Sequence, residues 1–187
     1  NVTDGVLNLN EFGWPQSRSR YFVFASKSYE SSFNDLDTYK NESLVTLSEI
    51  FEMSKSVSNN NEVISELSPE NKQRVEYLFK NNLYDLPNGE RPKCHQNGTT
   101  YKSSYGRIRL DGVAPTITTG FLSPGRGRFV HPTEKRTLSL NEASLIQSFP
   151  LTFNWDIGSN QKVQIAKWIG NAVPPLFGYY LSSLLRI

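Results

Sequence analysis

The sequence predicts an α/β fold, because signals for both strands and helices occur along the chain. A short apolar, aromatic-rich run at residues 21–25 is typical of a buried strand. A capping-box sequence begins at Ser139, and apolar residues recur at helical spacing after residue 175. These three observations together favour a mixed fold with a sheet and covering helices.

The first part of the chain contains the predicted strands. Residues 6–9 alternate weakly, and a turn at residues 13–15 separates them from the strand at residues 21–25. The following stretch is rich in Ser, Asn, Asp and Glu. We expect it to hold a helix around residues 44–53, which is followed by a polar loop at residues 56–61.

A second helix is expected to begin at Ser68 and to run through Phe79. Ser is a good helix cap, and Pro69 suits the first helical turn because its missing N–H is not needed there. After residues 86–89 we expect loops and short strands as far as Phe129.

Two helices are predicted near the C-terminus. In the capping box, the Ser139 and Glu142 side chains each satisfy an otherwise free amide, and the helix should run to about Ser148 and stop at residues 149–150. The last helix follows residues 174–175, and its apolar stripe should pack against a sheet. The stripe consists of Leu176, Phe177, Tyr180, Leu181, Leu184 and Leu185.

Length and composition indicate a globular chain of one domain or one and a half. The 187 residues include 37% hydrophobic and 20% charged types, and no apolar run reaches the roughly 18 residues of a membrane span. The start lacks a Met and a secretory leader, so we expect a piece of a longer protein. One Cys and two His argue against a disulfide framework or a metal site and fit a cytoplasmic protein.

The charge is distributed unevenly. Residues 1–100 hold 10 Lys and Arg against 14 Asp and Glu, whereas residues 101–187 hold 10 against 4. In residues 101–136 arginines are interspersed with glycines, which suits phosphate contact because Arg offers a forked donor array and Gly lets the backbone approach. A solvated face is the alternative explanation on charge alone.

Three segments resemble motifs of the DNA cytosine-5 methyltransferases. The segment Pro15-Gln16-Ser17-Arg18-Ser19-Arg20 resembles the family's Pro-Gln-x-Arg-x-Arg motif. Residues 136–150 (RTLSLNEASLIQSFP) are similar to its Arg-x-Leu-Thr-x-x-Glu-Ala-x-x-x-Gln-x-Phe-Pro motif, and residues 170–175 (GNAVPP) to its closing motif. The block YGRIRLDGVAPTITTGF at residues 105–121 also resembles the end of the family's target-recognition region. Because the motifs occur in the family's order, the sequence is identified as a member, and specifically as its C-terminal part.

The resemblance implies a domain plan. It predicts the C-terminal part of a doubly wound, Rossmann-like methyltransferase sheet with an inserted, smaller target-recognition domain. Residues 1–27 would end the catalytic sheet and residues 28–132 would form the recognition domain. Residues 133–187 would return to the catalytic domain and supply a terminal helix on the cofactor side.

The resemblance also implies a function. The complete enzyme would flip a cytosine out of double-stranded DNA and transfer a methyl group from S-adenosylmethionine to its C5 atom, as in restriction-modification systems. Its N-terminal catalytic portion would be present in cis or as a separate subunit, without a membrane, in the cytoplasm or on a bacterial nucleoid. The alternative is a non-catalytic DNA-binding or regulatory subunit that acts with a partner methyltransferase chain.

Arg18 and Arg20 are the candidate catalytic residues. Their side chains, two apart at the start of a strand, leave the same face and can converge on one phosphate or base edge. A pair of surface arginines on an edge strand is the alternative. The resemblance implies that both line the pocket for the flipped cytosine.

The closing motif supplies the candidate cofactor residues. Gly170 permits a tight backbone, and Asn171 can cap the following helix, whose free amides attract a carboxylate. A plain capped helix start is the alternative. The resemblance implies that Asn171, Ala172 and Val173 contact S-adenosylmethionine.

Further candidates follow from the resemblance and the basic stretch. Arg136, Glu142 and Gln147 are expected to organise the structure rather than to take part in chemistry. The candidate DNA-binding residues are Gln16, Arg107, Arg109, Thr116, Thr118, Thr119, Arg126 and Arg128.

The family's nucleophilic cysteine has no counterpart here. Cys94 lies inside the expected recognition region and out of order with the motifs, although Lys93 and His95 could lower its pKa. The family's Phe-x-Gly-x-Gly and Glu-Asn-Val motifs are also missing. We therefore expect this chain to be inactive by itself.

Overall fold

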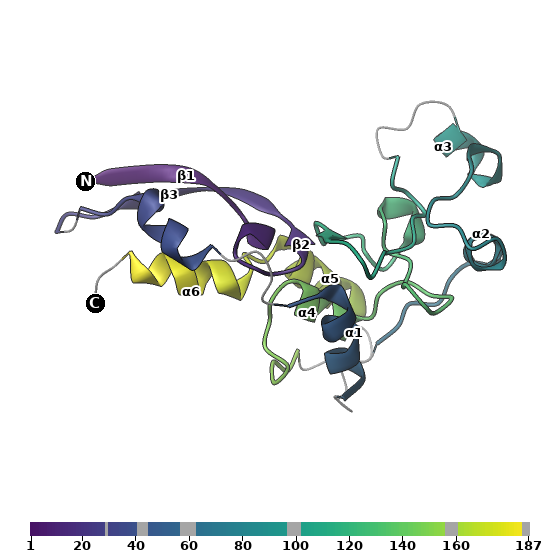
Figure 1. The fold of residues 1–187 in the computed structure, drawn as a ribbon. Helices are drawn as coiled ribbons and strands as arrows, with labels where there is room; N and C mark the ends of the chain where they lie inside the picture. Colours follow the sequence, from purple (N-terminus) through teal and green to yellow (C-terminus); the bar gives the residue numbers. More distant parts are fainter. Residues whose placement is uncertain (29, 41–44, 57–62, 97–101, 156–160, 185–187) are drawn as a thin grey trace.

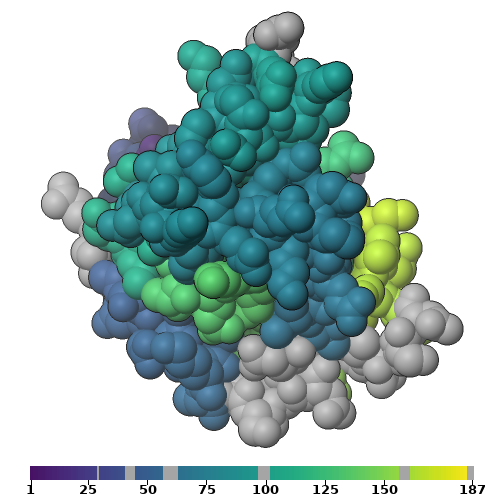
Figure 2. All heavy atoms as spheres, turned by 90° about the vertical axis from the view of Figure 1, so that its right-hand side faces the viewer, coloured from purple at the N-terminus to yellow at the C-terminus, as the bar shows by residue number. Residues whose placement is uncertain are grey.

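The computed structural model describes residues 1–28, 30–40, 45–56, 63–96, 102–155 and 161–184, whose buried side chains form three hydrophobic clusters. Figure 1 shows a two-stranded ribbon with the last described helix at one end of the molecule, where the chain also begins. Two helices of the chain's middle lie at the opposite end. Figure 2, which faces that end, shows the segment around residues 65–110 covering it.

The ribbon is formed by β1 (Val2–Asn8) and β3 (Ser19–Ala25), which pair antiparallel. One face packs against α6 (Pro175–Ser183) and the 3-10 helix η2 (Phe33–Tyr39). The opposite face consists of exposed side chains, because successive residues of a strand point to opposite sides. Its apolar members, 63–72% exposed, are Val2, Val6, Tyr21 and Val23.

The predicted strand at residues 21–25 is therefore confirmed, but the expectation that it is buried is wrong for one face. No described residue covers Tyr21 and Val23. The apolar stripe of α6, in contrast, packs against the ribbon as predicted, with Phe177, Tyr180 and Leu184 buried. Leu185, the last member of that stripe, lies outside the described residues. No helix within the described ranges has both the length and the apolar character needed to cross a membrane.

The central cluster lies among α1 (Leu47–Ser56), α4 (Leu140–Ile146), α5 (Lys162–Asn171) and residues 108–129. A short parallel pair joins β2 (Gln16–Ser17) to β4 (Ala114–Pro115) beside it. The helix expected around residues 44–53 is present but begins at Leu47; residue 44 and residues 57–61 of the expected loop lie outside the described part.

Helix α4 ends two residues earlier than predicted. Its capping residue is Gln147, and Ser148 adopts a left-handed backbone with φ of 65°. An L-residue in that conformation cannot continue a right-handed helix, so the helix ends before the predicted stop at residues 149–150.

The third cluster lies under α2 (Pro69–Lys80), at the far end from the ribbon. Ser68 caps α2 through Oγ, which accepts a hydrogen bond from the Asn71 amide, and this confirms the predicted helix start. The loops and short strands expected up to Phe129 are confirmed only in part. The one strand among the described residues there is β4, and the other short elements are helical: η3 (Asn88–Glu90), α3 (Lys93–Gln96) and η4 (Pro124–Arg126).

Candidate functional site

The segment that carries the first motif is attached to the C-terminal end of α4. Trp14 Nε1 donates to the carbonyl oxygens of Leu145 and Ile146 at 3.2 and 3.0 Å, and Gln16 Nε2 donates to the Ile146 oxygen at 2.6 Å. The last carbonyls of a helix have no partner within the helix. The segment of the first motif therefore satisfies the Ile146 carbonyl at the end of α4 and adds a second donor to that of Leu145, which also accepts from the Ser148 amide.

Arg18 joins three segments that are far apart in the sequence. Its Nη1 donates to the Ile117 carbonyl at 2.9 Å, and its Nη2 donates to those of Gly170 and Ala172 at 3.0 and 2.9 Å. The side chain is 1% exposed. Burial, and next the positive charge of Arg20, lower the pKa of Arg18 to about 10. The guanidinium thus holds the ends of β3, α5 and residues 114–119 in one junction.

Arg20 differs from Arg18 in its accessibility. It lies on β3 opposite Leu7 and is partly exposed, and its Nη1 donates to the Ser19 carbonyl at 2.7 Å. Of the two candidate catalytic arginines, Arg18 is therefore enclosed by protein groups, whereas Arg20 reaches the surface of the junction.

Gly170 lies against the backbone of residues 118–119. A Cβ atom at this position would be 2.3 Å from the amide nitrogen of Thr119, so only glycine allows this approach. The prediction that Asn171 caps the next helix is wrong. Helix α5 continues through Asn171, an extended Ala172 follows, and Pro174 precedes α6 without a side-chain cap.

The candidate cofactor residues differ in exposure. Asn171 and Val173 are exposed, and Val173 is 55% exposed. Ala172 is half-buried, and its carbonyl oxygen is held by Arg18. Only Asn171 and Val173 present side chains freely to a ligand.

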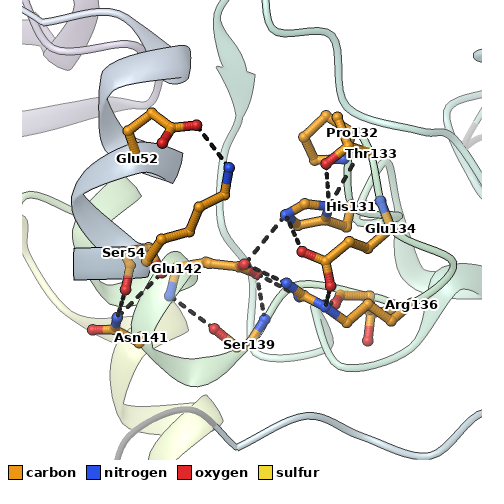
Figure 3. Close-up of polar contacts among 12 residues, drawn as sticks. Glu52, Ser54, His131, Pro132, Thr133, Glu134, Arg136, Ser139, Asn141 and Glu142 are labelled. Carbon is orange, nitrogen blue, oxygen red and sulfur yellow. Dashed lines mark hydrogen bonds and ion pairs between the residues drawn. The ribbon is translucent and has the colours of Figure 1, made fainter. Parts of the chain in front are cut away.

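An ionic cluster supports the start of α4 (Figure 3). The predicted capping box is confirmed: the Glu142 amide donates to Ser139 Oγ at 3.1 Å, and the Ser139 amide donates to Glu142 Oε2 at 2.8 Å. Arg136 adds two hydrogen bonds to the Glu142 carboxylate, at 2.8 and 2.6 Å. Nε2 of buried His131 lies 3.2 Å from Glu142 Oε1.

Glu142 is ionised because its partners outweigh its burial. Burial by itself raises the pKa of Glu142, but hydrogen bonds from Arg136 and His131 and the positive charge of Arg136 lower it to about 2. The His131 Nδ1 atom accepts hydrogen bonds from the amides of Thr133 and Glu134, so its proton lies on Nε2, facing Glu142. The cluster is saturated by internal contacts, which fits the organising role expected of Arg136 and Glu142.

Gln147, the third residue expected to be organising, makes a comparable contact. Its Nε2 donates to the Ile169 carbonyl at 2.6 Å, and the side chain is fully buried. This bond ties the end of α4 to the end of α5.

The candidate DNA-binding residues near the junction fall into two groups. Gln16 is fully buried, and Thr116 Oγ1 donates to the Ser17 carbonyl at 2.6 Å, so both make internal contacts. Thr118, Thr119 and Arg126 are exposed, and the Arg126 side chain lies over Gly120.

The remaining candidates lie near the third cluster. Arg128 is bonded internally, with Nη1 donating to the carbonyls of Tyr84 and Arg107 and Nη2 paired with Asp85. Arg107 and Arg109 both lie over the ring of Tyr84.

Several residues of these sites were not predicted from the sequence. The bonds of Trp14 to α4 and of His131 to Glu142 join segments more than ten residues apart, which periodicity cannot reveal. The aromatic partners of the arginines, Phe79 and Tyr84, lie in segments that were expected only to be a helix and a loop. The density of Arg and aromatic residues between positions 77 and 109 was the signal that could have found them.

Cys94 lies outside the junction. It is exposed, on α3, at the opposite end of the molecule from α6 (Figure 1). Within the described ranges, no three His, Cys, Asp or Glu residues are grouped as metal ligands would be.

Comparison with known proteins identifies relatives of the whole chain. Residues 1–184 match the family model described as C-5 cytosine-specific DNA methylase. Type II methyltransferase M1.BsuMI of Bacillus subtilis is 47% identical over 182 residues, which cover 95% of this chain and 42% of that protein. Type II methylase M.HgiDII of Herpetosiphon aurantiacus is 30% identical, with 99% and 55% covered. The chain thus spans about half the length of these relatives.

Solved structures resemble the fold as well. The Dnmt2 methyltransferase of S. pombe superposes with a TM-score of 0.64 at 15% identity, over 99% of this chain and 56% of that structure. An Entamoeba histolytica methyltransferase, EhMeth, gives a TM-score of 0.56 at 16% identity, over 99% of this chain and 53% of that structure. The mixed α/β arrangement is therefore that of methyltransferases.

Proposed function

The chain belongs to the C-5 cytosine-specific DNA methylase family, and from this premise we propose that it is the C-terminal part of a DNA cytosine-5 methyltransferase. In the complete enzyme, a cytosine is flipped out of double-stranded DNA and methylated at C5. This part supplies target recognition through residues 28–132. Residues 1–27 and 133–187 complete the catalytic domain with its base and cofactor pockets.

The observation that carries the proposal is the junction around Arg18. Arg18 is bonded there to Ile117, Gly170 and Ala172, and the second motif is attached through the bonds of Gln16 to Ile146 and of Gln147 to Ile169. A rigid support of this kind holds neighbouring groups in the geometry that catalysis needs. Arg20, two residues after Arg18 and partly exposed, is the group that contacts the flipped base.

The exposed side chains of the closing motif have the chemical groups needed to contact S-adenosylmethionine. The Asn171 amide can both donate to a carboxylate and accept from an ammonium group, and Val173 offers apolar contact. A carboxylate and an ammonium group both occur at the methionine end of S-adenosylmethionine. This cofactor supplies the methyl group when it is bound. Ala172 fixes the backbone between them through its bond to Arg18.

DNA contacts are assigned to the exposed candidates Thr118, Thr119, Arg126 and Arg109. The chain's second half is the basic one, with 10 Lys and Arg against 4 Asp and Glu. Positive charge of this kind favours the DNA backbone. Gln16, Thr116 and Arg128 support these residues through internal bonds.

A catalytic portion that carries the nucleophile completes the enzyme, in cis or as a separate subunit. The outer face of the β1–β3 ribbon, with Val6, Tyr21 and Val23 each 63% exposed, is the surface we assign to this contact. An apolar face of this size gains free energy when a further layer covers it, because apolar surface is removed from water.

The test is methyl transfer to DNA with the chain alone and with the chain joined to the catalytic portion encoded with it. We expect transfer of labelled methyl groups from S-adenosylmethionine to cytosine C5 only by the complete enzyme. Methylation by the 187-residue chain alone would contradict the assignment of the nucleophile to another portion. DNA binding without methylation in the complete assembly would favour the alternative, a non-catalytic DNA-binding or regulatory subunit.

A further inference from the structure

Two arginines and two aromatic rings form an alternating stack near the third cluster. The Arg107 guanidinium carbon lies 4.5 Å from the centre of the Phe79 ring and 4.8 Å from that of Tyr84. The Arg109 guanidinium carbon lies 4.3 Å from the Tyr84 ring centre. The order Phe79, Arg107, Tyr84, Arg109 places Arg109 at the end of the stack.

Hydrogen bonds hold the inner members of the stack in place. The Arg107 amide donates to the Tyr84 carbonyl at 2.8 Å, and Arg107 Nε donates to the Pro132 carbonyl at 2.7 Å. Arg128 Nη1 donates to the carbonyls of both Tyr84 and Arg107, at 3.0 and 3.1 Å. These bonds hold the backbone of Tyr84, and the guanidinium groups of Arg107 and Arg109 both pack on its ring.

Arg109 is the exposed arginine of the stack, whereas Arg107 is half-buried and bonded through Nε to Pro132. Among the described residues, the Arg109 side chain has neither a hydrogen bond nor an ion pair. Residues 110–113, which follow directly, line a groove together with Pro15 of the first motif and the preceding Gly13 and Trp14. Arg109 thus lies at the end of a segment that borders the junction.

We infer that Arg109, whose guanidinium lies over the Tyr84 ring, reads a guanine in the major groove of the DNA target by donating to its O6 and N7 atoms. This inference rests on the proposed function. The planar fork of Arg matches these two acceptors, and no other base offers the same pair in the major groove. An aromatic ring under the guanidinium restricts its motion and lowers the entropy lost in such a bidentate contact. A phosphate contact needs only positive charge near the backbone and gains less from a ring that restricts the side chain.

The test is selection of random double-stranded DNA by the complete enzyme, with bound and unbound DNA sequenced. We expect the wild-type enzyme to enrich G at one position, and Arg109→Ala to reduce that preference by about 5- to 150-fold while other positions are retained. Arg109→Lys should lose most of the same preference, because Lys keeps the charge without the fork.

Two further comparisons test whether the preference for G depends on the Tyr84 ring. Tyr84→Phe keeps the ring and should leave the preference unchanged, whereas Tyr84→Leu removes the ring and should weaken it at the same position. Arg126→Ala is the matched control: Arg126 is exposed and lies over no aromatic ring of the described residues, so its loss should weaken binding evenly and reduce the salt dependence of binding. Thermal unfolding confirms that each variant is folded.

The inference is overturned if Arg109→Ala lowers binding evenly with an unchanged sequence preference, which would identify a phosphate contact. It is also overturned if no G is enriched by the wild-type enzyme or if Arg109→Lys keeps the preference. Because the selection measures binding, it is independent of methyl transfer. Absence of methylation by the complete enzyme would contradict the proposed function and leave the result for Arg109 valid.

Discussion

Gly170 and Thr119 are in backbone contact, so close that a Cβ atom on Gly170 would lie 2.3 Å from the Thr119 amide nitrogen. The Gly170 carbonyl oxygen also accepts a hydrogen bond from Arg18. One glycine thus brings the end of α5 against the segment that follows β4 and offers an acceptor to the first motif.

The substitution Gly170→Ala should destabilise the protein. The added methyl group meets backbone atoms that cannot rotate away, and overpacking of this kind costs about 1–3 kcal/mol. Urea unfolding measures the loss. Gly178→Ala in α6 is the control, because no atom lies within 4 Å of its Cβ position, and Ala favours a helix by up to about 1 kcal/mol over Gly. Equal stability of the two variants would contradict the close contact.

The substitution Arg20→Ala should impair methyl transfer in the complete enzyme far more than DNA binding. We expect kcat/KM to fall by about 10²-fold, the usual effect of removing one donor to the reacting group, with the Kd for DNA changed by less than about tenfold. Single-turnover methylation and DNA titration measure the two effects. Equal losses in both would indicate a phosphate contact instead.

The substitution Arg18→Met should act on stability. It removes three hydrogen bonds to the carbonyls of Ile117, Gly170 and Ala172 and leaves these acceptors buried, at a cost of about 1–3 kcal/mol for each. Urea unfolding should show the loss before any assay of activity. If Arg18→Met is as stable as wild type but inactive, Arg18 acts on substrate and not through the junction.

The ionised Glu142 should make stability depend on acid pH. Its folded-state pKa of about 2 lies below the ordinary value of 4.5, so its contribution is present above pH 4.5 and is lost as the pH falls toward 2. The contribution is on the order of 3 kcal/mol. Urea unfolding at a series of pH values should show this loss in the wild type and a flatter profile in Glu142→Gln. If the free energy of unfolding fell equally with pH in the wild type and in Glu142→Gln, the contribution of the ionised Glu142 would be contradicted.

Cys94 should be dispensable for methyl transfer. It is exposed on α3, away from the junction, so Cys94→Ser in the complete enzyme should retain activity within about twofold. Labelled methyl transfer measures it, with the cysteine of the catalytic portion replaced as the positive control for inactivation. An inactive Cys94→Ser variant that is still folded would make Cys94 a nucleophile candidate again.

The local elements of this fold could be predicted because their signals are local. Ser68 and Pro69 start α2, the Ser139–Glu142 pair starts α4, and the stripe through Phe177 and Tyr180 marks the buried face of α6. Each signal depends on atoms only a few residues apart. The ends of elements were less predictable: the turn at Ser148 depends on a backbone conformation that residue type alone does not reveal.

The sequence by itself determined which motifs this protein carries, their order, and hence its family and the types of residue at its site. Only the tertiary structure decided which of these residues are buried in internal contacts and which are accessible to a ligand. Arg18 and Arg20 are equivalent as sequence letters, but three carbonyls from distant segments enclose one and leave the other accessible. Asn171, which the sequence placed before a helix, ends one instead. Arg109 and Arg128 likewise differ only through their partners, because burial and hydrogen bonding depend on segments that meet after folding.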